Sequence, residues 1–302
     1  MRHTLDLCPR VDLLTSAKGI RGIRDQRPVL RAPQILATNS IQMVLTTHVD
    51  NLLVRVPRRL ETMVVENGMR ATVIQALRSC QGDLHLGKNA LLAVLSAADQ
   101  RSHSIHPEEG QVLSPRACAK KRTEFALGRA AVRHALRELG EGSFPVLRGG
   151  QGQPLWPEGI MGSITHCWPW AVALVVKSEK PFAIGIDLEN LEKARMVDIS
   201  GLICTGSELV WAHGGFDFQE RLAMIFSAKE TVYKAFYRFC RRYIDFKEIE
   251  LSWFPDRQLF RMAFLGGTRN EFPSVRGCEV HCRRFNGLVF SCLVHEPAKK
   301  AA

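Results

Sequence analysis

The sequence has no apolar run that approaches the roughly 20 residues of a membrane-spanning helix. Its N-terminus lacks the apolar segment of a secretory signal, and Asp6, Asp12 and Asp25 argue against an organellar transit peptide. The nine cysteines are odd in number, dispersed along the chain and without a C-x-x-C pair. These absences exclude an integral membrane protein and a disulfide-stabilised secreted domain, and they favour the reducing cytoplasm.

No block of Lys and Arg stands out, and the sequence contains no internal repeat or low-complexity tract. The chain nevertheless carries 41 Lys and Arg against 30 Asp and Glu, a formal net charge of +11. A nucleic acid, a membrane surface or a phosphate-rich ligand would each suit that excess. Nucleic-acid binding stays an alternative, although the sequence shows no helix-turn-helix, no RNP-like aromatic strand and no zinc module.

The 302 residues, with ordinary shares of apolar (46%) and charged (24%) side chains, are enough for about two domains. Residues 1–104 give few clear signals: one or two strands are expected at Ile41–Val56, and short helices at Leu60–Arg78 and Lys88–Ala98. Apolar periodicity then predicts a helix from residue 114 to Leu139 and a second helix at Gln219–Tyr243. β-like runs predict strands at Met161–His166, Trp170–Val176, Phe182–Leu188, Glu248–Trp253, Gln258–Phe264, Cys278–Phe285 and Leu288–His295. The first three lie close together with tight connections, which indicates that they form one small antiparallel sheet. The order of helix, strands, helix and strands indicates an α+β fold with two similar halves.

Two carboxylates lie two residues apart at the end of the third expected strand. On a strand, Asp187 and Glu189 point to the same side, where they repel each other unless a cation lies between them. Mg²⁺ is a suitable cation because it binds carboxylates together with phosphate oxygens. An exposed strand end is an equally good interpretation of an isolated D-x-E pattern.

A Lys-Glu-x3-Lys pattern lies on the second expected helix, within Phe226–Phe236. Glu230 and Lys234 are four residues apart, and such a pair on a surface stabilises a helix by a few tenths of a kcal/mol. Here aromatic residues surround the pair, so its polar side chains are partly buried and a functional role is favoured.

Three further features are compatible with a bound anion. Arg122 and Arg129 follow one edge of the first expected helix, where a solvated face is the alternative. The glycine-rich segment Arg148–Pro154 can form a hairpin or let backbone amides approach an anion, but it is no Walker loop because no Gly-Lys-Ser/Thr follows. In Gly162–His166, two hydroxyls precede a histidine, which makes a phosphate contact reasonable.

Taken together, these motifs resemble those of the 4′-phosphopantetheinyl transferases, of the monomeric type that activates enterobactin and surfactin synthetases. The resemblance covers about Ile105 to His295, and its specificity comes from five motifs in the family's order. The motifs are Lys121-Arg122-x-Glu124-Phe125…Gly128-Arg129, Gly152-x-Pro154…Trp156-Pro157, Gly162-Ser163-Ile164-Thr165-His166, Gly185-Ile186-Asp187-x-Glu189 and Phe226-Ser227-Ala228-Lys229-Glu230-x3-Lys234-Ala235.

The resemblance implies an enzyme that moves the phosphopantetheine arm of coenzyme A onto a serine of an apo carrier protein and releases 3′,5′-ADP. Coenzyme A and an acidic carrier protein both suit a chain of charge +11. The implied enzyme is a cytoplasmic monomer that uses Mg²⁺, or Mn²⁺ in its place, and has no nucleic-acid or membrane partner. A relative that binds the carrier without transferring the arm is the other alternative, and the three acidic motif residues argue against it.

The resemblance also assigns roles to residues, all of them tied to phosphate chemistry. The implied metal ligands are Asp187, Glu189 and Glu230. The implied catalytic residues are Glu230, Lys234, Lys229 and His166, with Glu230 or a water that it orients taking the serine proton. The implied coenzyme A-binding residues are Lys121, Arg122, Arg129, Gln151, Ser163, Thr165, His166, Lys229 and Lys234. Gln151 stands where some relatives have a basic residue, so one phosphate contact differs here.

The implied fold is a pair of α+β halves related by pseudo-twofold symmetry, each with a long helix packed on a small antiparallel sheet. Coenzyme A would lie in the cleft between the halves. We therefore expect an N-terminal extension of unassigned role at 1–104, a first transferase half at 105–184 and a second half at 185–296.

Overall fold

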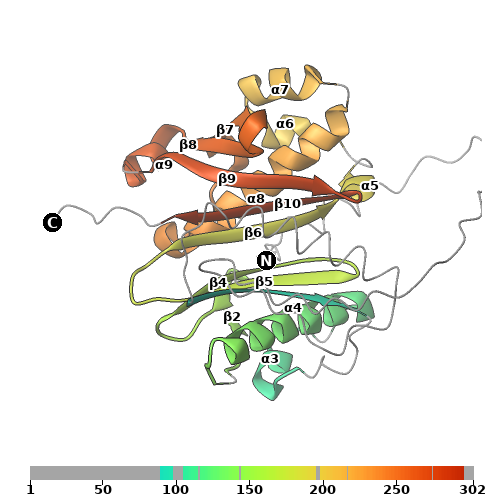
Figure 1. The fold of residues 1–302 in the computed structure, drawn as a ribbon, viewed down its shortest axis with the longest axis vertical. Helices are drawn as coiled ribbons and strands as arrows, with labels where there is room; N and C mark the ends of the chain where they lie inside the picture. The colour runs from blue at the N-terminus through green and yellow to red at the C-terminus, as the bar shows by residue number, and fades with distance from the viewer. Residues whose placement is uncertain are drawn as a thin grey trace, which may run out of the picture. The chain divides into compact units, whose positions relative to one another are not determined.

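The computed structural model describes residues 89–97, 105–114, 116–142, 144–194, 198–215, 217–273 and 275–295 (Figure 1). The chain divides into two compact units, Met1–Val49 and Asp50–Ala302, and every described residue belongs to the second. Most of the predicted N-terminal extension, including Ile41–Val56 and Leu60–Arg78, therefore lies outside the described residues. The described part combines helices with antiparallel sheets, which confirms the predicted α+β class.

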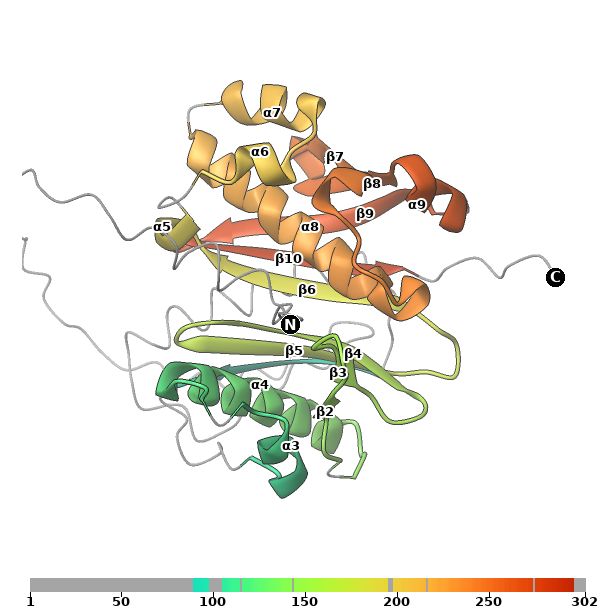
Figure 2. The same ribbon diagram turned by 180° about the vertical axis from the view of Figure 1, so that it is seen from behind.

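A three-stranded antiparallel sheet and a long helix make up the first half (Figures 1 and 2). The strands, in sheet order, are β1 (Ala90–Ser96), β5 (Trp170–Lys177) and β4 (Ile160–Cys167). Helix α4 (Ala119–Glu138) packs on this sheet, and Ala131, Ala135 and Leu136 on its inner face are fully buried. The small side chains of Ala131 and Ala135 let the helix approach the sheet closely, and the short helix α3 (Pro107–Gln111) precedes it.

Residues 90–96 form a strand, so the helix predicted at Lys88–Ala98 is wrong. Strand β1 pairs with β5 along its whole length, from Ala90 opposite Val176 to Ser96 opposite Trp170, and all its residues are buried. In a short run of apolar residues, polar and apolar positions do not alternate. The pattern therefore cannot distinguish a buried strand from a buried helix. Because β1 precedes residue 105, the sheet of the first half already begins inside the predicted extension.

The glycine-rich segment forms a hairpin. Its two short strands are β2 (Leu147–Arg148) and β3 (Pro154–Leu155). The amide of Gly152 donates to the carbonyl oxygen of Gly149 at 2.9 Å, and Gly152 has a φ of +87° that side-chain-bearing residues rarely adopt. Of the two interpretations left open by the sequence, the structure therefore supports the hairpin.

The second half contains a five-stranded antiparallel sheet covered by the longest helix. The strands, in sheet order, are β6 (Ala183–Asn190), β10 (Leu288–His295), β9 (Arg276–Phe285), β8 (Leu259–Phe264) and β7 (Ile249–Phe254). Helix α8 (Phe218–Cys240) lies against β6 and β10 (Figure 2). The shorter elements are α5 (Leu191–Ala194), α6 (Ser200–Ile203), α7 (Gly206–His213), η3 (Phe246–Glu248), η4 (Pro255–Arg257) and α9 (Gly266–Glu271). Strand β6 was predicted to share a sheet with β4 and β5, but it pairs with β10 instead.

The edge strands β4 and β6 of the two sheets lie side by side and are joined through side chains. The backbone amide of Ile186 donates to Ser163 Oγ at 3.1 Å, and that of Leu188 donates to Thr165 Oγ1 at 3.1 Å. Two hydroxyls of β4 thus satisfy amides of β6 that face away from its own sheet. This β4–β6 seam connects the halves, and the D-x-E pattern lies on it.

Gly185 on β6 is required by the close approach of α8. A Cβ atom added there would lie 2.0 Å from the carbonyl oxygen of Thr231. We predict that Gly185→Ala lowers the free energy of unfolding by about 1–3 kcal/mol, because α8 must move away from the sheet. Urea unfolding measures the change.

Gly201 on α6 provides the matched control, since a Cβ atom added there meets nothing within 4 Å. Gly201→Ala is expected to leave the stability unchanged or to raise it slightly. An equal urea midpoint for Gly185→Ala and the native protein would contradict the close approach.

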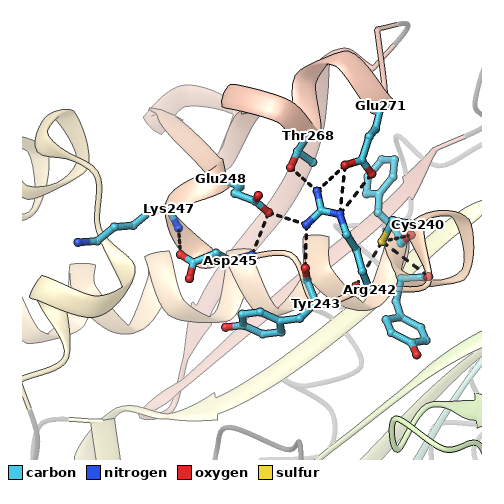
Figure 3. A network of polar contacts seen from close by, with 10 residues as sticks. Cys240, Arg242, Tyr243, Asp245, Lys247, Glu248, Thr268 and Glu271 are labelled. Atoms are coloured by element: carbon cyan, nitrogen blue, oxygen red, sulfur yellow. Dashed lines mark hydrogen bonds and ion pairs between the residues drawn. The ribbon is translucent and has the colours of Figure 1, made fainter.

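Arg242 fixes the chain after the C-terminal end of α8 (Figure 3). Its guanidinium donates to Glu271, to Glu248 at 2.9 Å and to Thr268 Oγ1 at 2.6 Å. The same group donates to the carbonyl oxygen of Tyr243 at 2.8 Å. One side chain thereby ties η3 and α9 to the end of the helix that carries Glu230, and the two carboxylates raise the pKa of Arg242 above its ordinary value.

Candidate active site

Asp187 is the centre of a hydrogen-bonded group between the β4–β6 seam and α8. Its carboxylate is fully buried, and Oδ1 accepts from Lys234 Nζ at 2.7 Å and from Thr165 Oγ1 at 3.2 Å. Lys234 Nζ also donates to the carbonyl oxygen of Ile186 at 3.1 Å. A cation and a hydroxyl thus compensate the lost hydration of the buried carboxylate. The Lys234 side chain keeps 23% of its surface exposed, so the pair links a buried anion to a cation that solvent can reach.

The other two predicted metal ligands lie on the same two elements. Glu189 follows Asp187 by two residues on β6 and is half-buried. Glu230 precedes Lys234 by one turn on α8 and is only 5% exposed. Burial raises the pKa of Tyr243 to about 12, and the charges of Asp245 and Glu230 add to the shift. The predicted strand and helix are confirmed as the positions of these two carboxylates.

The three carboxylates are chemically suited to Mg²⁺, which prefers oxygen ligands. In the structure, Oδ1 of Asp187 contacts the ammonium of Lys234 at 2.7 Å. Within the described ranges, no group of three or more His, Cys, Asp or Glu side chains is placed so that it could hold a metal ion. Metal binding at Asp187, Glu189 and Glu230 therefore stays a prediction that requires a rearrangement.

Four predicted ligand-binding residues lie at exposed or partly exposed positions. Lys121 and Arg122 are exposed on the first turn of α4, where Arg122 Nε donates to the carbonyl oxygen of Ala117 at 2.9 Å. His166 on β4 is 38% exposed, and its Nδ1 lies 4.0 Å from Glu124 Oε2. Gln151 is exposed on the hairpin, and its backbone amide donates to Gln153 Oε1. Their contacts with a ligand stay predictions.

Ser163 and Thr165 have structural contacts in the β4–β6 seam, and their phosphate contacts stay predictions. Their exposed fractions are 3% and 1%, and both hydroxyls are engaged in the seam. Alternation along β4 explains the difference from His166, which points to the opposite side of the strand.

Arg129 on α4 is buried without a carboxylate of its own. It is 7% exposed, its guanidinium lies 4.5 Å from the centre of the Phe125 ring, and its Nε has no hydrogen-bond partner among the described residues. Burial is the main cause that lowers the pKa of Arg129 to about 10; Glu109 raises it, while Arg148 and Arg133 lower it. A buried guanidinium with an unused donor is suited to a bound anion.

Glu109 of α3, whose charge acts on Arg129, is hydrogen-bonded to other groups. It accepts from Arg133 Nη1 at 2.6 Å, from the amide of Val146 at 3.0 Å and from the amide of His106 at 3.1 Å. Arg148, at the start of the hairpin, lies against Gly152 and forms no ion pair with a carboxylate in the described part of the chain. Arg129 and Arg148 thus form no ion pair with a described acidic side chain, although the charge of Glu109 raises the pKa of Arg129.

Lys229 does not lie near the phosphate-binding groups, which corrects the sequence prediction. It is fully buried, and its Nζ lies 2.7–2.8 Å from four oxygens. These acceptors are the carbonyl oxygens of Ile203, Phe246 and Ile249 and Oε2 of Glu208. The side chain therefore serves to join α6, α7, η3 and β7 to α8.

Sequence reasoning missed three residues of these clusters: Glu109, Arg148 and Glu208. Glu208 had a readable signal, since Thr205-x-x-Glu208 is a capping box that marks the start of α7. Glu109 likewise caps α3, with His106 as its partner. Arg148 has no comparable pattern, because an arginine before a glycine turn is common on any surface.

Two long helices on two antiparallel sheets define an α+β protein, with an Asp–Lys pair at the seam between its halves. Two family models match the chain. The 4′-phosphopantetheinyl transferase N-terminal domain matches residues 108–176, and the 4′-phosphopantetheinyl transferase superfamily matches residues 183–276.

Curated relatives point to the same family. The chain is 34% identical to 4′-phosphopantetheinyl transferase Svp of Streptomyces mobaraensis over 177 residues, which is 57% of this chain and 71% of that protein. It is 31% identical to PptT of Mycobacterium tuberculosis over 50% of this chain and 66% of that protein. It is 40% identical to enterobactin synthase component D of Escherichia coli O157:H7 over 38% of this chain and 55% of that protein. The chain belongs to the 4′-phosphopantetheinyl transferase superfamily.

Solved structures give a weaker likeness. The holo-[acyl-carrier-protein] synthase of Thermotoga maritima matches at 17% identity and a TM-score of 0.30, covering 39% of this chain and 64% of that chain. Among the described residues, no helix is both long enough and apolar enough to cross a membrane.

Proposed function

We propose that this chain transfers the 4′-phosphopantetheine arm of coenzyme A to a serine of an apo carrier protein and releases 3′,5′-ADP. The observation that carries the proposal is the Asp187–Lys234 pair, at 2.7 Å, on the strand and helix that the superfamily model spans. The relatives named above are phosphopantetheinyl transferases or a component of enterobactin synthase, which supports the same activity.

The anionic substrate suits the arginines of the first half. Arg129 and Arg148 can each give two parallel hydrogen bonds to a phosphate group, for which guanidinium is better shaped than ammonium. We assign them to the 3′-phosphate of coenzyme A, with exposed Lys121 and Arg122 at the rim and His166 at another phosphate. Arg148 supplies a cation on the same hairpin as Gln151.

The chemistry needs a proton acceptor and a group that stabilises negative charge. The serine oxygen forms a bond to the pantetheine-bearing phosphorus, and the bond from that phosphorus to the oxygen of 3′,5′-ADP breaks. Glu230 takes the serine proton directly or through a water, as a carboxylate base. Lys234 uses two donors on Asp187 and Ile186, so its third donor is available to a phosphate oxygen in the transition state.

Mg²⁺, or Mn²⁺ in its place, remains a prediction for Asp187, Glu189 and Glu230, and no step above depends on it. We further propose a monomer in the cytoplasm that acts without a nucleic-acid or membrane partner. All seven described cysteines are free thiols, which supports a reducing compartment.

The experiment that tests this function is a mass measurement. The protein is mixed with coenzyme A, Mg²⁺ and an apo carrier protein, and the carrier is expected to gain about 340 Da, the mass of the arm. Enterobactin-type peptidyl carriers and a fatty-acid carrier are tested side by side. An unchanged mass for every carrier would contradict the proposal.

The arginine assignment makes a separate prediction. Arg148→Gln should raise KM for coenzyme A by about tenfold or more, because a charge-assisted hydrogen bond to phosphate is lost, and should leave kcat nearly unchanged. With dephospho-coenzyme A, which lacks the 3′-phosphate, Arg148→Gln and the native protein should have similar KM values. Arg137→Gln, on the exposed side of α4, is the control and should alter neither value.

A further inference from the structure

The buried carboxylate of Glu109 joins three segments of the first half. Its side chain is fully buried on α3, a short helix that lies next to α4 and contacts β2 (Figures 1 and 2). One oxygen, Oε2, accepts from Arg133 Nη1 on α4 at 2.6 Å and from the amide of His106 at 3.1 Å. The other oxygen, Oε1, accepts from the amide of Val146 at 3.0 Å. Glu109 therefore fastens both α4 and the chain before β2 to α3.

The two arginines assigned to phosphate lie close to these attachment points. Arg129 precedes Arg133 by one helical turn, so its guanidinium is carried by the part of α4 that Glu109 holds. Arg148 follows Val146 by two residues and lies on β2, the strand that begins directly after the second attachment point. The contacts of Glu109 on both sides therefore set the spacing between the two guanidinium groups.

The charges around Arg129 suit a phosphate monoester. Arg133 and Arg148 lower the pKa of Arg129 and Glu109 raises it, so all three charges lie within electrostatic range of Arg129. Together the four groups carry three positive charges and one negative charge. A phosphate monoester, with about two negative charges at neutral pH, offsets this excess. In coenzyme A the 3′-phosphate is the only monoester, since the other two phosphates form a pyrophosphate diester.

We propose that Glu109 is a positioning residue for the 3′-phosphate of coenzyme A, which it places by setting the spacing of Arg129 and Arg148. The inference rests on the proposed function, which supplies the phosphate ligand. Both carboxylate oxygens of Glu109 accept from groups of the protein, so Glu109 acts through the arginines and does not contact the ligand. A correctly spaced pair of guanidinium groups gives parallel hydrogen bonds to one phosphate, and a misplaced pair loses them.

Glu109→Asp separates the position of this carboxylate from its charge. Aspartate keeps the negative charge but is shorter by one methylene group, so it cannot reach Arg133 and Val146 together. We expect the ratio of the dissociation constant for dephospho-coenzyme A to that for coenzyme A, measured by calorimetry, to fall about tenfold, because only the 3′-phosphate contacts weaken. Glu108→Asp makes the same change at the exposed neighbouring position and should leave the ratio unchanged.

This ratio distinguishes a positioning role from a purely structural one. A less stable fold, checked by urea unfolding, would weaken the binding of both ligands alike and leave the ratio as it is in the native protein. An unchanged ratio for a folded Glu109→Asp variant therefore overturns the inference, and so does an equal fall of the ratio in Glu108→Asp.

Hydrogen exchange of the native protein decides the question if Glu109→Asp does not fold. Because Glu109 links the arginines to the amides of His106 and Val146, saturating coenzyme A should slow the exchange of these amides several-fold more than saturating dephospho-coenzyme A does. Equal protection by the two ligands, read by mass spectrometry of the peptides that contain these amides, overturns the inference.

Both measurements need ligand binding alone, so they are independent of arm transfer. Arm transfer by the native protein, together with an unchanged ratio and equal protection, would refute this inference and leave the proposed function in place. The predicted ratio and protection without arm transfer to any carrier would refute the proposed function and leave the role of Glu109 in place.

Discussion

Asp187→Asn is expected to lower kcat for arm transfer by about a thousandfold, the loss typical when a charged group that organises a transition state is removed. Asparagine has the same size and can still accept a hydrogen bond from Thr165 Oγ1. It cannot hold the ammonium of Lys234 by charge, so the lysine loses its fixed position beside the phosphate. Asp187 therefore acts in part through Lys234.

The fold should survive this substitution. Lys234 is partly exposed and reaches water when its carboxylate is gone, so no buried charge is left without a partner. Circular dichroism and urea unfolding check that Asp187→Asn remains folded. KM for coenzyme A should change far less than kcat, because Arg129 and Arg148 lie on other elements.

Asp256→Asn makes the same chemical change at an exposed position on η4 and serves as the control. Its kcat should equal that of the native protein. A folded Asp187→Asn variant with a kcat within tenfold of the native value would remove Asp187 from the active site.

The sequence was sufficient for the parts of the site that strict periodicity positions. Alternation on a strand placed Asp187 and Glu189 on one side of β6, and the four-residue spacing placed Glu230 and Lys234 one turn apart on α8. Both patterns depend only on local backbone geometry. The α+β class followed for the same reason, since each long element carried its own periodic signal.

The features that the sequence did not reveal depend on contacts between distant segments. Strand β1 looked like a helix because a short apolar run is buried in the same way in either form. Strand β6 was expected beside β5, yet it pairs with β10, about 100 residues later in the chain. Ser163 and Thr165 looked like ligand contacts because nothing local shows that their hydroxyls satisfy amides of β6.

Lys229→Met is expected to lower the free energy of unfolding by about 3–5 kcal/mol, the range for removing one partner of a buried ion pair. Methionine fills a similar volume but donates nothing. The Glu208 carboxylate, which is 1% exposed, would be left without its cation, and three carbonyl oxygens would lose a donor. Urea unfolding followed by circular dichroism measures the loss.

Two comparisons separate the buried ion pair from general effects of losing a lysine. Lys247→Met, at an exposed position, should change the stability by less than about 0.5 kcal/mol. Lys229→Met combined with Glu208→Gln should lose less stability than the two single changes added together, because the double variant leaves no buried charge unpaired. Burial lowers the pKa of Lys229, and the charge of Glu208 opposes that shift. Each of the two buried charges therefore stabilises the other.

The two lysines of the Lys-Glu-x3-Lys pattern are therefore expected to separate into different roles. Lys229→Met should act mainly on stability, whereas Lys234→Met should act mainly on kcat, because Lys234 is partly exposed beside Asp187. A Lys229→Met variant that unfolds like the native protein but has lost arm transfer would reverse this division. Helical spacing alone cannot assign the roles. The two lysines are five positions apart on α8, yet one ammonium has four buried oxygen neighbours and solvent reaches the other.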